Sequence, residues 1–330
     1  MQPLVSVFML TYKHEKFIAQ AIESVVSQEC DFLFELIIAE DCSPDGTLAI
    51  ALDYQRRYPH LIRVLTGDKN VGFIANSERR MSAMRGRYMA TCEGDDYWNH
   101  PRKLQMQVDL MRANPGMRSC HTDYDRESRF RLSRSKHKRK GRSARWLAQG
   151  TTYRDLLLDW SVITATTMFD KDIYFEFKRS EFSRRDWPFG DYNLFLFASL
   201  QGAVGYVDES TATYRKIKGS STNQSHRSRL TMILATLECV DLFMKRHPIA
   251  PGDTLQVRAR IIKRIYRMAF YAERTDLMQE NHEWLRRHGL HPGEWRHRLR
   301  LATLACKFPV RLLRAVKNFV GRQLHSISAG

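Results

Sequence analysis

The sequence contains no apolar run near the ~20 residues that a membrane-spanning helix needs. Its N-terminus, M-Q-P-L-V-S-V-F-M-L, lacks the basic segment and small-residue cleavage site of a secretory signal, so we expect a first strand there. The six cysteines are dispersed and form no C-x-x-C pair, which argues against a zinc site and suits a reducing cytosol. These absences together predict a cytoplasmic protein.

Acidic residues are scarce relative to basic ones. With 53 Lys and Arg against 36 Asp and Glu, the 330-residue chain carries a formal charge of +17. Such a charge indicates a polyanionic partner, which could be a nucleic acid, an anionic membrane surface or an anionic substrate. The hydrophobic share of 43% is ordinary for a globular protein, and the length suggests one large or two modest domains.

Acids nevertheless gather in the stretch 87–98, R-Y-M-A-T-C-E-G-D-D-Y-W. It begins as a buried strand and ends with Glu93, Asp95 and Asp96 within four residues. Because like charges repel, a divalent cation such as Mg²⁺ or Mn²⁺, which takes carboxylate and phosphate oxygens, would offset them. The alternative is a solvated acidic turn. The position after an apolar strand, where open α/β sheets bind ligands, favours the cation.

Strands and helices alternate through the first hundred residues. We expect strands at 4–10, 34–39, 61–65 and 87–92. Helices are expected at 16–28, from the turn at 42–47 to about residue 58, and at 74–84. This alternation predicts an α/β fold with a mostly parallel sheet. The turns at Thr11, Asp41 and Asp95 would then line one edge of the sheet, where nucleotides commonly bind.

The second half of the chain is less regular. We expect strands at 117–124, 162–169 and 204–207, and helices at 101–114, 151–159 and 192–200. The basic stretch 126–145 is predicted to be a mobile loop, which is either merely solvated or gathers an anionic acceptor. Helices are expected at 230–246, 255–274, 276–287 and 292–326. The last one is basic and amphipathic, so it either lies on an anionic membrane surface or packs on its own domain.

Five motifs, in order along the chain, resemble those of family 2 glycosyltransferases. They are V-S-V-F-M-L-T-Y-K-H-E-K-F-I-A-Q-A-I-E-S-V-V-S-Q at 5–28, I-I-A-E-D-C-S-P-D-G-T at 37–47, N-V-G-F at 70–73, E-G-D-D-Y-W at 93–98 and F-G-D-Y-N-L-F-L at 189–196. A T-Y-R at 213–215 follows them. The resemblance implies a GT-A fold, which is a Rossmann-like and mostly parallel sheet flanked by helices. It also implies sugar transfer from a nucleotide-diphosphate donor, with UDP-sugars favoured.

The resemblance further implies roles for single residues. The nucleotide-sugar site would contain Thr11, Tyr12, Glu15, Asp41, Asn70, Gly72, Glu93, Asp96, Tyr214 and Arg215. Asp95 would bind Mn²⁺ or Mg²⁺, whereas Glu93, which is longer than the usual Asp, would act through water or the ribose. Asp96 would contact sugar hydroxyls or fix the turn. Tyr214 and Arg215 would lie near the diphosphate, in a loop that closes the site.

Asp191 would be the general base for the acceptor hydroxyl, and the apolar surfaces of Trp187 and Phe189 would raise its pKa. Two alternatives stand beside this assignment. Asp191 also fits an ordinary N-cap for the helix at 192, and Asp186 competes as the acid of a D-W-P triplet. Likewise, Asp41 could cap the turn at 42–46, and the turn at 70–72 could be purely structural.

The resulting prediction is a metal-dependent inverting glycosyltransferase that moves single sugars. No Q-x-x-R-W motif of processive synthases is present, and the acceptor by resemblance is a glycan or a lipid-linked sugar of the cell envelope. We expect a catalytic domain at 1–222 and a basic helical region at 223–330, with the protein in the cytoplasm or peripheral on the inner membrane face. The alternatives are a basic nucleic-acid-binding protein, which lacks a helix-turn-helix or ribonucleoprotein signature here, and an inactive scaffold.

Overall fold

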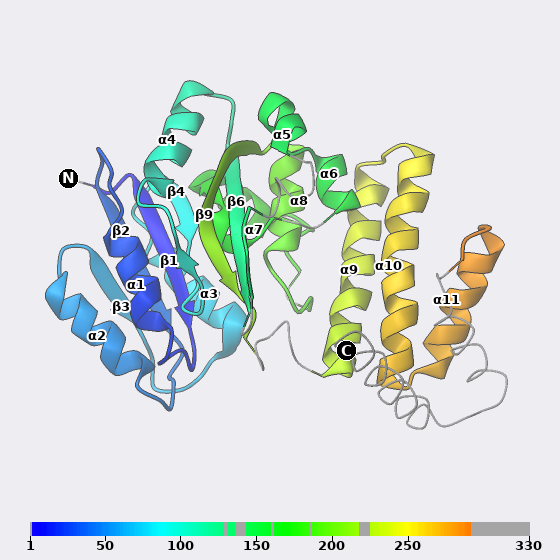
Figure 1. Ribbon diagram of the computed structural model, residues 1–330, viewed down its shortest axis with the longest axis horizontal. Coiled ribbons are helices and arrows are strands. Elements are labelled where there is room, and N and C mark those ends of the chain that lie inside the picture. The colour runs from blue at the N-terminus through cyan, green and yellow to red at the C-terminus, as the bar shows by residue number, and fades with distance from the viewer. Residues whose placement is uncertain are drawn as a thin grey trace, which may run out of the picture. The chain divides into compact units, whose positions relative to one another are not determined.

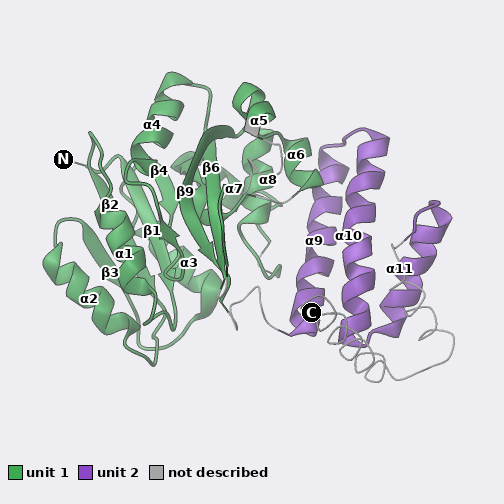
Figure 2. Ribbon diagram, viewed as in Figure 1, with its two compact units in different colours: residues 1–217 green, residues 218–330 purple. Residues whose placement is uncertain are grey.

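The computed structural model describes residues 2–128, 131–135, 143–159, 162–184, 186–217 and 225–291. The chain divides into two compact units, residues 1–217 and 218–330 (Figure 2). The domain boundary predicted at 222 and the helix predicted at 292–326 lie outside the described residues. Among the described helices, none combines the length and the apolar character required to span a membrane.

The first half of unit 1 alternates strand and helix, as predicted (Figure 1). Its elements are β1 (Val5–Thr11), α1 (Ile18–Val26), β2 (Phe34–Glu40), α2 (Thr47–Arg57), β3 (Ile62–Leu65), α3 (Gly72–Ser82) and β4 (Tyr88–Thr91). β1 pairs in parallel with β2 and β4, and β2 pairs in parallel with β3. Every residue of β1 is buried, because helices cover both faces of the sheet and so favour an uninterrupted apolar run.

The second half makes the sheet mixed. Its elements are β5 (Tyr97–Trp98), α4 (Lys103–Ala113), β6 (Ser119–Ser128), β7 (Arg131–Ser133), α5 (Ser143–Gln149), α6 (Tyr153–Leu158), the short 3₁₀ helix η2 (Thr164–Thr166), β8 (Met168–Asp170), α7 (Lys171–Arg179), α8 (Tyr192–Leu200) and β9 (Gly205–Arg215). The strand order is β3-β2-β1-β4-β8-β6-β9-β5, with β7 paired to β6. β8 runs antiparallel to both of its neighbours, β4 and β6.

Three predictions for this half are wrong in part. The strand expected at 162–169 is a 3₁₀ turn followed by the short β8, because the hydroxyls of Thr166 and Thr167 bond to the carbonyl oxygens three residues before them. The loop expected at 126–145 begins as strand pairing between β6 and β7 and ends in α5. The strand expected at 204–207 extends to Arg215, so Tyr214 and Arg215 lie in β9 rather than in a loop.

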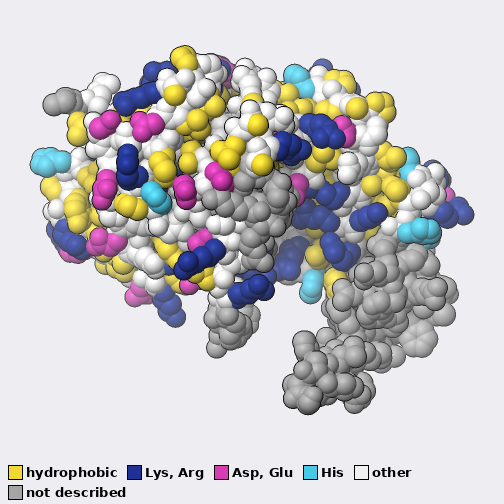
Figure 3. All heavy atoms as spheres, turned by 45° about the horizontal axis from the view of Figure 1, so that its top comes forward, with side chains coloured by type: hydrophobic (Ala, Val, Ile, Leu, Met, Phe, Trp, Pro, Cys, Tyr) yellow, Lys and Arg dark blue, Asp and Glu magenta, His cyan; other side chains and the backbone are white. Residues whose placement is uncertain are grey.

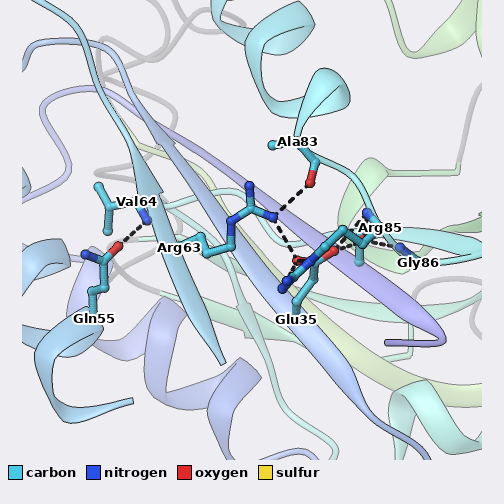
Figure 4. A network of polar contacts seen from close by, with 8 residues as sticks. Glu35, Gln55, Arg63, Val64, Ala83, Arg85 and Gly86 are labelled. Atoms are coloured by element: carbon cyan, nitrogen blue, oxygen red, sulfur yellow. Dashed lines mark hydrogen bonds and ion pairs between the residues drawn. The ribbon is translucent and has the colours of Figure 1, made fainter. Parts of the chain in front are cut away.

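Glu35 joins strands and loops at the amino end of the parallel strands (Figure 4). It is 1% exposed and accepts hydrogen bonds from Ser6 Oγ at 2.6 Å and from Arg85 Nε at 2.8 Å and N at 3.0 Å. Arg63 Nη1 lies 3.3 Å from the same carboxylate and also donates to the carbonyl of Ala83. Burial alone would raise the pKa of Glu35, but these hydrogen bonds outweigh it and lower the pKa below its usual value.

Unit 2 contains α9 (His226–Arg246), α10 (Pro251–Ala272) and α11 (Thr275–Arg287), which confirms three predicted helices. α10 packs against both α9 and α11 and supplies buried side chains such as Ile261 and Tyr266. Pro251 opens α10 at its first turn, and Glu273 closes it with a left-handed φ of 61°. Lys and Arg side chains gather on the face of these helices seen in Figure 3.

Candidate active site

The parallel strands bring their carboxyl ends to one edge of the sheet. Thr11, the last residue of β1, pairs in register with Glu40, the last residue of β2. Backbone bonds continue beyond the strands: the amide of Asp41 donates to the carbonyl of Thr11 at 3.1 Å, and the amide of Gly94 donates to that of Leu10 at 3.0 Å. The predicted turns at Thr11 and Asp41 therefore meet at the end of β1. The third predicted turn, in the acidic stretch that contains Asp95, adjoins them.

Asp41 fixes the turn at 70–72. Its buried carboxylate accepts hydrogen bonds from the amides of Val71 at 2.9 Å and Gly72 at 2.8 Å, and its carbonyl accepts one from the Asn70 side chain at 3.1 Å. Gly72 has a φ of +82°, which a side chain would strain. The amides of residues 42 and 43 donate instead to Glu40, so Asp41 does not cap that turn.

The acidic stretch is pressed against the end of β1 at Gly94. A Cβ at this position would lie 2.7 Å from Thr11 Oγ1 and 2.8 Å from His14 Nδ1, so the close approach requires glycine. Glu93 turns back toward the sheet, where its Oε2 accepts the amide of Leu10 at 3.2 Å. The Asp95 side chain remains 22% exposed, with His14 Nε2 at 4.0 Å. Asp95 therefore offers a partly accessible carboxylate at this edge of the sheet.

Asp96 faces the opposite way, into the protein. It is buried, and its Oδ1 accepts the backbone amide of Arg215 at 2.8 Å. Burial, followed by the charge of Asp95, raises its pKa well above the usual value. The sequence prediction left two roles open for Asp96, and this contact favours fixing the turn.

Glu93 lies in a cluster of like charges. Its pKa is raised to about 7, chiefly by burial, with Arg80 opposing the shift and the charges of Asp95 and Asp191 adding to it. Arg80 itself is 8% exposed, and its Nε and Nη1 atoms have no hydrogen-bond acceptor among the described residues. The site thus contains more negative charge than the described side chains neutralise.

Asp191 joins this cluster from a segment a hundred residues further along the chain. It precedes α8, where its Oδ1 accepts the amide of Tyr192 at 2.9 Å, and burial raises its pKa. Trp187 and Phe189, which the sequence predicts to be its apolar surroundings, are buried and stack with ring centroids 5.9 Å apart. Asp186, the competing acid, has a side chain that is 58% exposed and is bound to Arg184.

The remaining predicted site residues are Tyr12, Glu15 and Tyr214, and each has its own neighbours. Tyr12 is 38% exposed, with Lys13 Nζ 5.0 Å from its ring centroid. The amide of Glu15 donates to Asp45 at 3.5 Å, beside the turn that follows Asp41. Tyr214 lies one residue before Arg215 in β9, with Arg126 6.0 Å from its ring.

Sequence reasoning missed His14 and Arg80. His14 hydrogen-bonds Thr11 at 3.2 Å, and burial lowers its pKa against the opposing charge of Asp95. The signal for His14 is its spacing, three residues after the edge residue Thr11. For Arg80 there is no such signal, because a helical Arg is normally exposed.

No three His, Cys, Asp or Glu side chains in the described part of the chain form a ready-made metal cage. Mg²⁺ and Mn²⁺ do not need one, since one or two carboxylates plus substrate phosphates suffice. A partly exposed Asp95 within an acidic cluster fits such a cation, whose coordination would be completed by a phosphorylated substrate.

Residues 6–173, about half of the chain, match Glycosyl transferase family 2, and the chain belongs to this family. An uncharacterized protein of Mycobacterium tuberculosis (strain ATCC 25618 / H37Rv) is 40% identical over 115 residues, covering 35% of this chain and 33% of that protein. The chain thus spans about a third of the length of the first curated relatives it matches. The putative teichuronic acid biosynthesis glycosyltransferase TuaG of Bacillus subtilis (strain 168) is 25% identical, with 69% of this chain and 84% of TuaG covered.

Solved structures confirm the GT-A fold. S. aureus TarS 1–349 in complex with UDP-GlcNAc superimposes with a TM-score of 0.56 at 15% identity, covering 88% of this chain and 93% of that one. The mannosyltransferase PcManGT from Pyrobaculum calidifontis, in complex with GDP-Man and Mn²⁺, gives 0.58 at 13% identity, covering 97% and 85%. The α/β architecture predicted from the sequence is therefore confirmed, with a mixed rather than a mostly parallel sheet.

Proposed function

We propose that the protein is an inverting glycosyltransferase that moves one sugar from a nucleotide-diphosphate donor to a hydroxyl of a glycan or lipid-linked acceptor. The observation that carries this proposal is the meeting of Asp191 with the Glu93–Asp96 stretch at the carboxyl edge of the sheet. Family membership and the GT-A fold support it.

Asp95 is the proposed ligand of Mn²⁺ or Mg²⁺, assisted by its exposed position. When bound, the cation would neutralise the diphosphate that leaves the sugar. Thr11, Tyr12, Glu15 and Asp41, with the turn at 70–72, line the proposed site for the base and ribose. A UDP-sugar is favoured, and TarS with UDP-GlcNAc supports this choice, whereas PcManGT with GDP-Man shows that the fold also accepts guanine.

Asp191 is the proposed general base. Its carboxylate takes the proton of the acceptor hydroxyl as the acceptor oxygen bonds to the anomeric carbon. The bond from that carbon to the diphosphate oxygen breaks on the opposite side, so the configuration inverts. The raised pKa of Asp191 suits a base, because a weakly basic carboxylate would draw the proton less strongly.

The name of TuaG supports an acceptor in cell-envelope polysaccharide synthesis. A peripheral position on the inner membrane face stays a prediction, because the segment 292–330 that motivates it lies outside the described residues. Binding to anionic vesicles that is lost on deletion of 296–330 would support it.

The test is a thermal-shift panel of UDP- and GDP-sugars with and without Mn²⁺. A ligand that binds the folded state raises the melting temperature by mass action. We expect a metal-dependent shift that Asp95→Ala removes and that the exposed surface variant Asp53→Ala retains. If no donor shifts wild type and no donor is hydrolysed, the inactive-scaffold alternative gains, and salt-sensitive nucleic-acid binding without donor affinity would favour that class instead.

A further inference from the structure

Arg215 at the end of β9 is held on every side by the protein. Its side chain is 10% exposed, and its guanidinium lies 4.3 Å from the ring centroid of Tyr97 and 5.4 Å from that of Phe17. Aromatic faces attract a guanidinium through their negative π surface. The charge therefore lies in a slot between α1 and the acidic stretch, rather than on an open surface.

All three nitrogen atoms of the guanidinium have hydrogen-bond partners in the protein. Nε donates to Glu127 Oε2 at 3.3 Å, Nη1 donates to the carbonyl of Asp95 at 3.2 Å, and Nη2 contacts Gln20 Oε1. The backbone amide of Arg215 adds the 2.8 Å bond to Asp96. One residue thus ties β9, β6 and α1 to the backbone of one acid and the carboxylate of the next.

We propose that Arg215 is a positioning residue that holds the Asp95–Asp96 pair in place for the metal, rather than a direct ligand of the diphosphate. The inference rests on the proposed function, in which Asp95 binds the cation. Asp95 and Asp96 repel each other, so an acidic stretch with an accessible metal ligand needs a fixed backbone and a nearby positive charge. Arg215 supplies both, because its fork spans three acceptors that a point charge cannot reach together.

Arg215→Lys separates the two roles. Lysine keeps a positive charge, so it would largely preserve electrostatic binding of a diphosphate, but it cannot bridge Gln20, Glu127 and the Asp95 carbonyl at once. In the positioning role, Arg215→Lys weakens Mn²⁺ binding about tenfold, the scale typical of residues that orient metal ligands. Gln20→Ala and Glu127→Gln, which remove hydrogen-bond partners of the guanidinium, reproduce part of that loss.

The measurement is Mn²⁺ binding to the full chain by electron paramagnetic resonance, with saturating UDP or GDP as the probe. At saturating Mn²⁺, nucleotide affinity stays within about twofold of wild type in all three variants, because the lost contacts act through the metal site. Amide hydrogen exchange of residues 93–98 rises in the same variants. Arg118→Lys is the matched control, since Arg118 also forms a two-nitrogen ion pair, with Glu176 at 2.9 and 3.0 Å, outside this site.

Wild-type Mn²⁺ affinity in Arg215→Lys and Glu127→Gln, with a loss of nucleotide affinity at saturating Mn²⁺ in Arg215→Ala, would overturn the proposal and make Arg215 a diphosphate ligand. Wild-type protein that binds neither UDP nor GDP with Mn²⁺ would overturn the proposed function, and this inference with it. The two failures are distinct, because the first requires that wild type binds nucleotide.

Discussion

Glu35, which is buried, and Glu93, which is partly exposed, lie at opposite ends of the parallel strands. Glu35, near the start of β2, receives donors from Ser6, Arg63 and Arg85, and its pKa is lowered. Glu93, just after β4, receives the amide of Leu10 and faces other acids, and burial raises its pKa to about 7. The first carboxylate stabilises the fold, whereas the second is held at a cost that a cation and substrate would relieve.

The two ends of the sheet differ in how fully their buried charges are neutralised. Ion pairs with Arg63 and Arg85 neutralise Glu35 at the amino end of the sheet, away from the acidic stretch at 93–98. At the carboxyl end, two nitrogen atoms of the buried Arg80 have no hydrogen-bond partner within the described part of the chain, while Asp95, Asp96 and Asp191 add negative charge. An end built for stability satisfies its charges internally, and an end built for binding leaves them for a ligand.

The largest expected effect is at the carboxyl end of the parallel strands, where the proposed active site lies. Asp191→Asn keeps the shape of the side chain but cannot take a proton, so turnover should fall about 1,000-fold, within the range for removal of a general base. Donor affinity should stay within about twofold, measured by titration calorimetry with the donor that the panel identifies.

Asp186→Asn is the control for that loss, because Asp186 is exposed and bound to Arg184. It should leave turnover unchanged. A fall in donor affinity in Asp191→Asn as large as that in Asp95→Ala would instead place Asp191 in the donor site.

The strand-end motifs are the part of this contrast that the sequence predicts well. β1, β2 and β4 are mostly apolar, so their ends, at Thr11, Glu40 and Thr91, can be located within a residue or two. Parallel pairing then places the acids together without further information. Only the resemblance to a family predicts that Asp191 lies in the same site as Glu93, because no local sequence pattern links these two residues.

Features set by tertiary packing escape the sequence. Glu35 reads as an ordinary polar residue in an apolar strand, and its partners Arg63 and Arg85 lie in separate segments. No helix is predicted at α7, whose Tyr174, Phe175 and Phe177 are residues that also favour strands. The sequence predicts that Arg215 lies in a loop, whereas β9 continues through Arg215 because it stays paired with β6.

The next effect is at the stable end. Glu35→Gln keeps the volume but removes the charge that Arg63 and Arg85 surround, so the free energy of unfolding at pH 7 should fall by about 2 kcal/mol. Because the folded pKa is lowered, this contribution is present above the ordinary pKa of 4.5 and is lost as pH falls through the folded value. Urea unfolding at pH 7 measures the loss of stability in Glu35→Gln, and the same experiment at pH 3 measures how much of that loss remains at low pH.

Glu176→Gln is the matched control, since the Glu176 pair with Arg118 is 38% exposed on the glutamate side. Such a pair contributes at most about 1 kcal/mol. Equal losses in the two variants would contradict the special role of Glu35.

The smallest expected effect has the opposite sign. In metal-free protein with EDTA, Glu93→Gln should raise the free energy of unfolding by about 1 kcal/mol at pH 8, because a charge that faces other acids is removed. This is less than the full pKa shift converts to, since Glu93 is partly exposed and the amide oxygen is a weaker acceptor for the Leu10 amide. The folded pKa of about 7 lies above the ordinary 4.5, so wild type loses stability as pH rises between these values. The advantage of Glu93→Gln should therefore grow from pH 4.5 to pH 7 and stay constant above. A variant that is less stable than wild type at pH 8 would show instead that Arg80 neutralises Glu93 fully, and the two ends of the sheet would then differ in partners but not in strain.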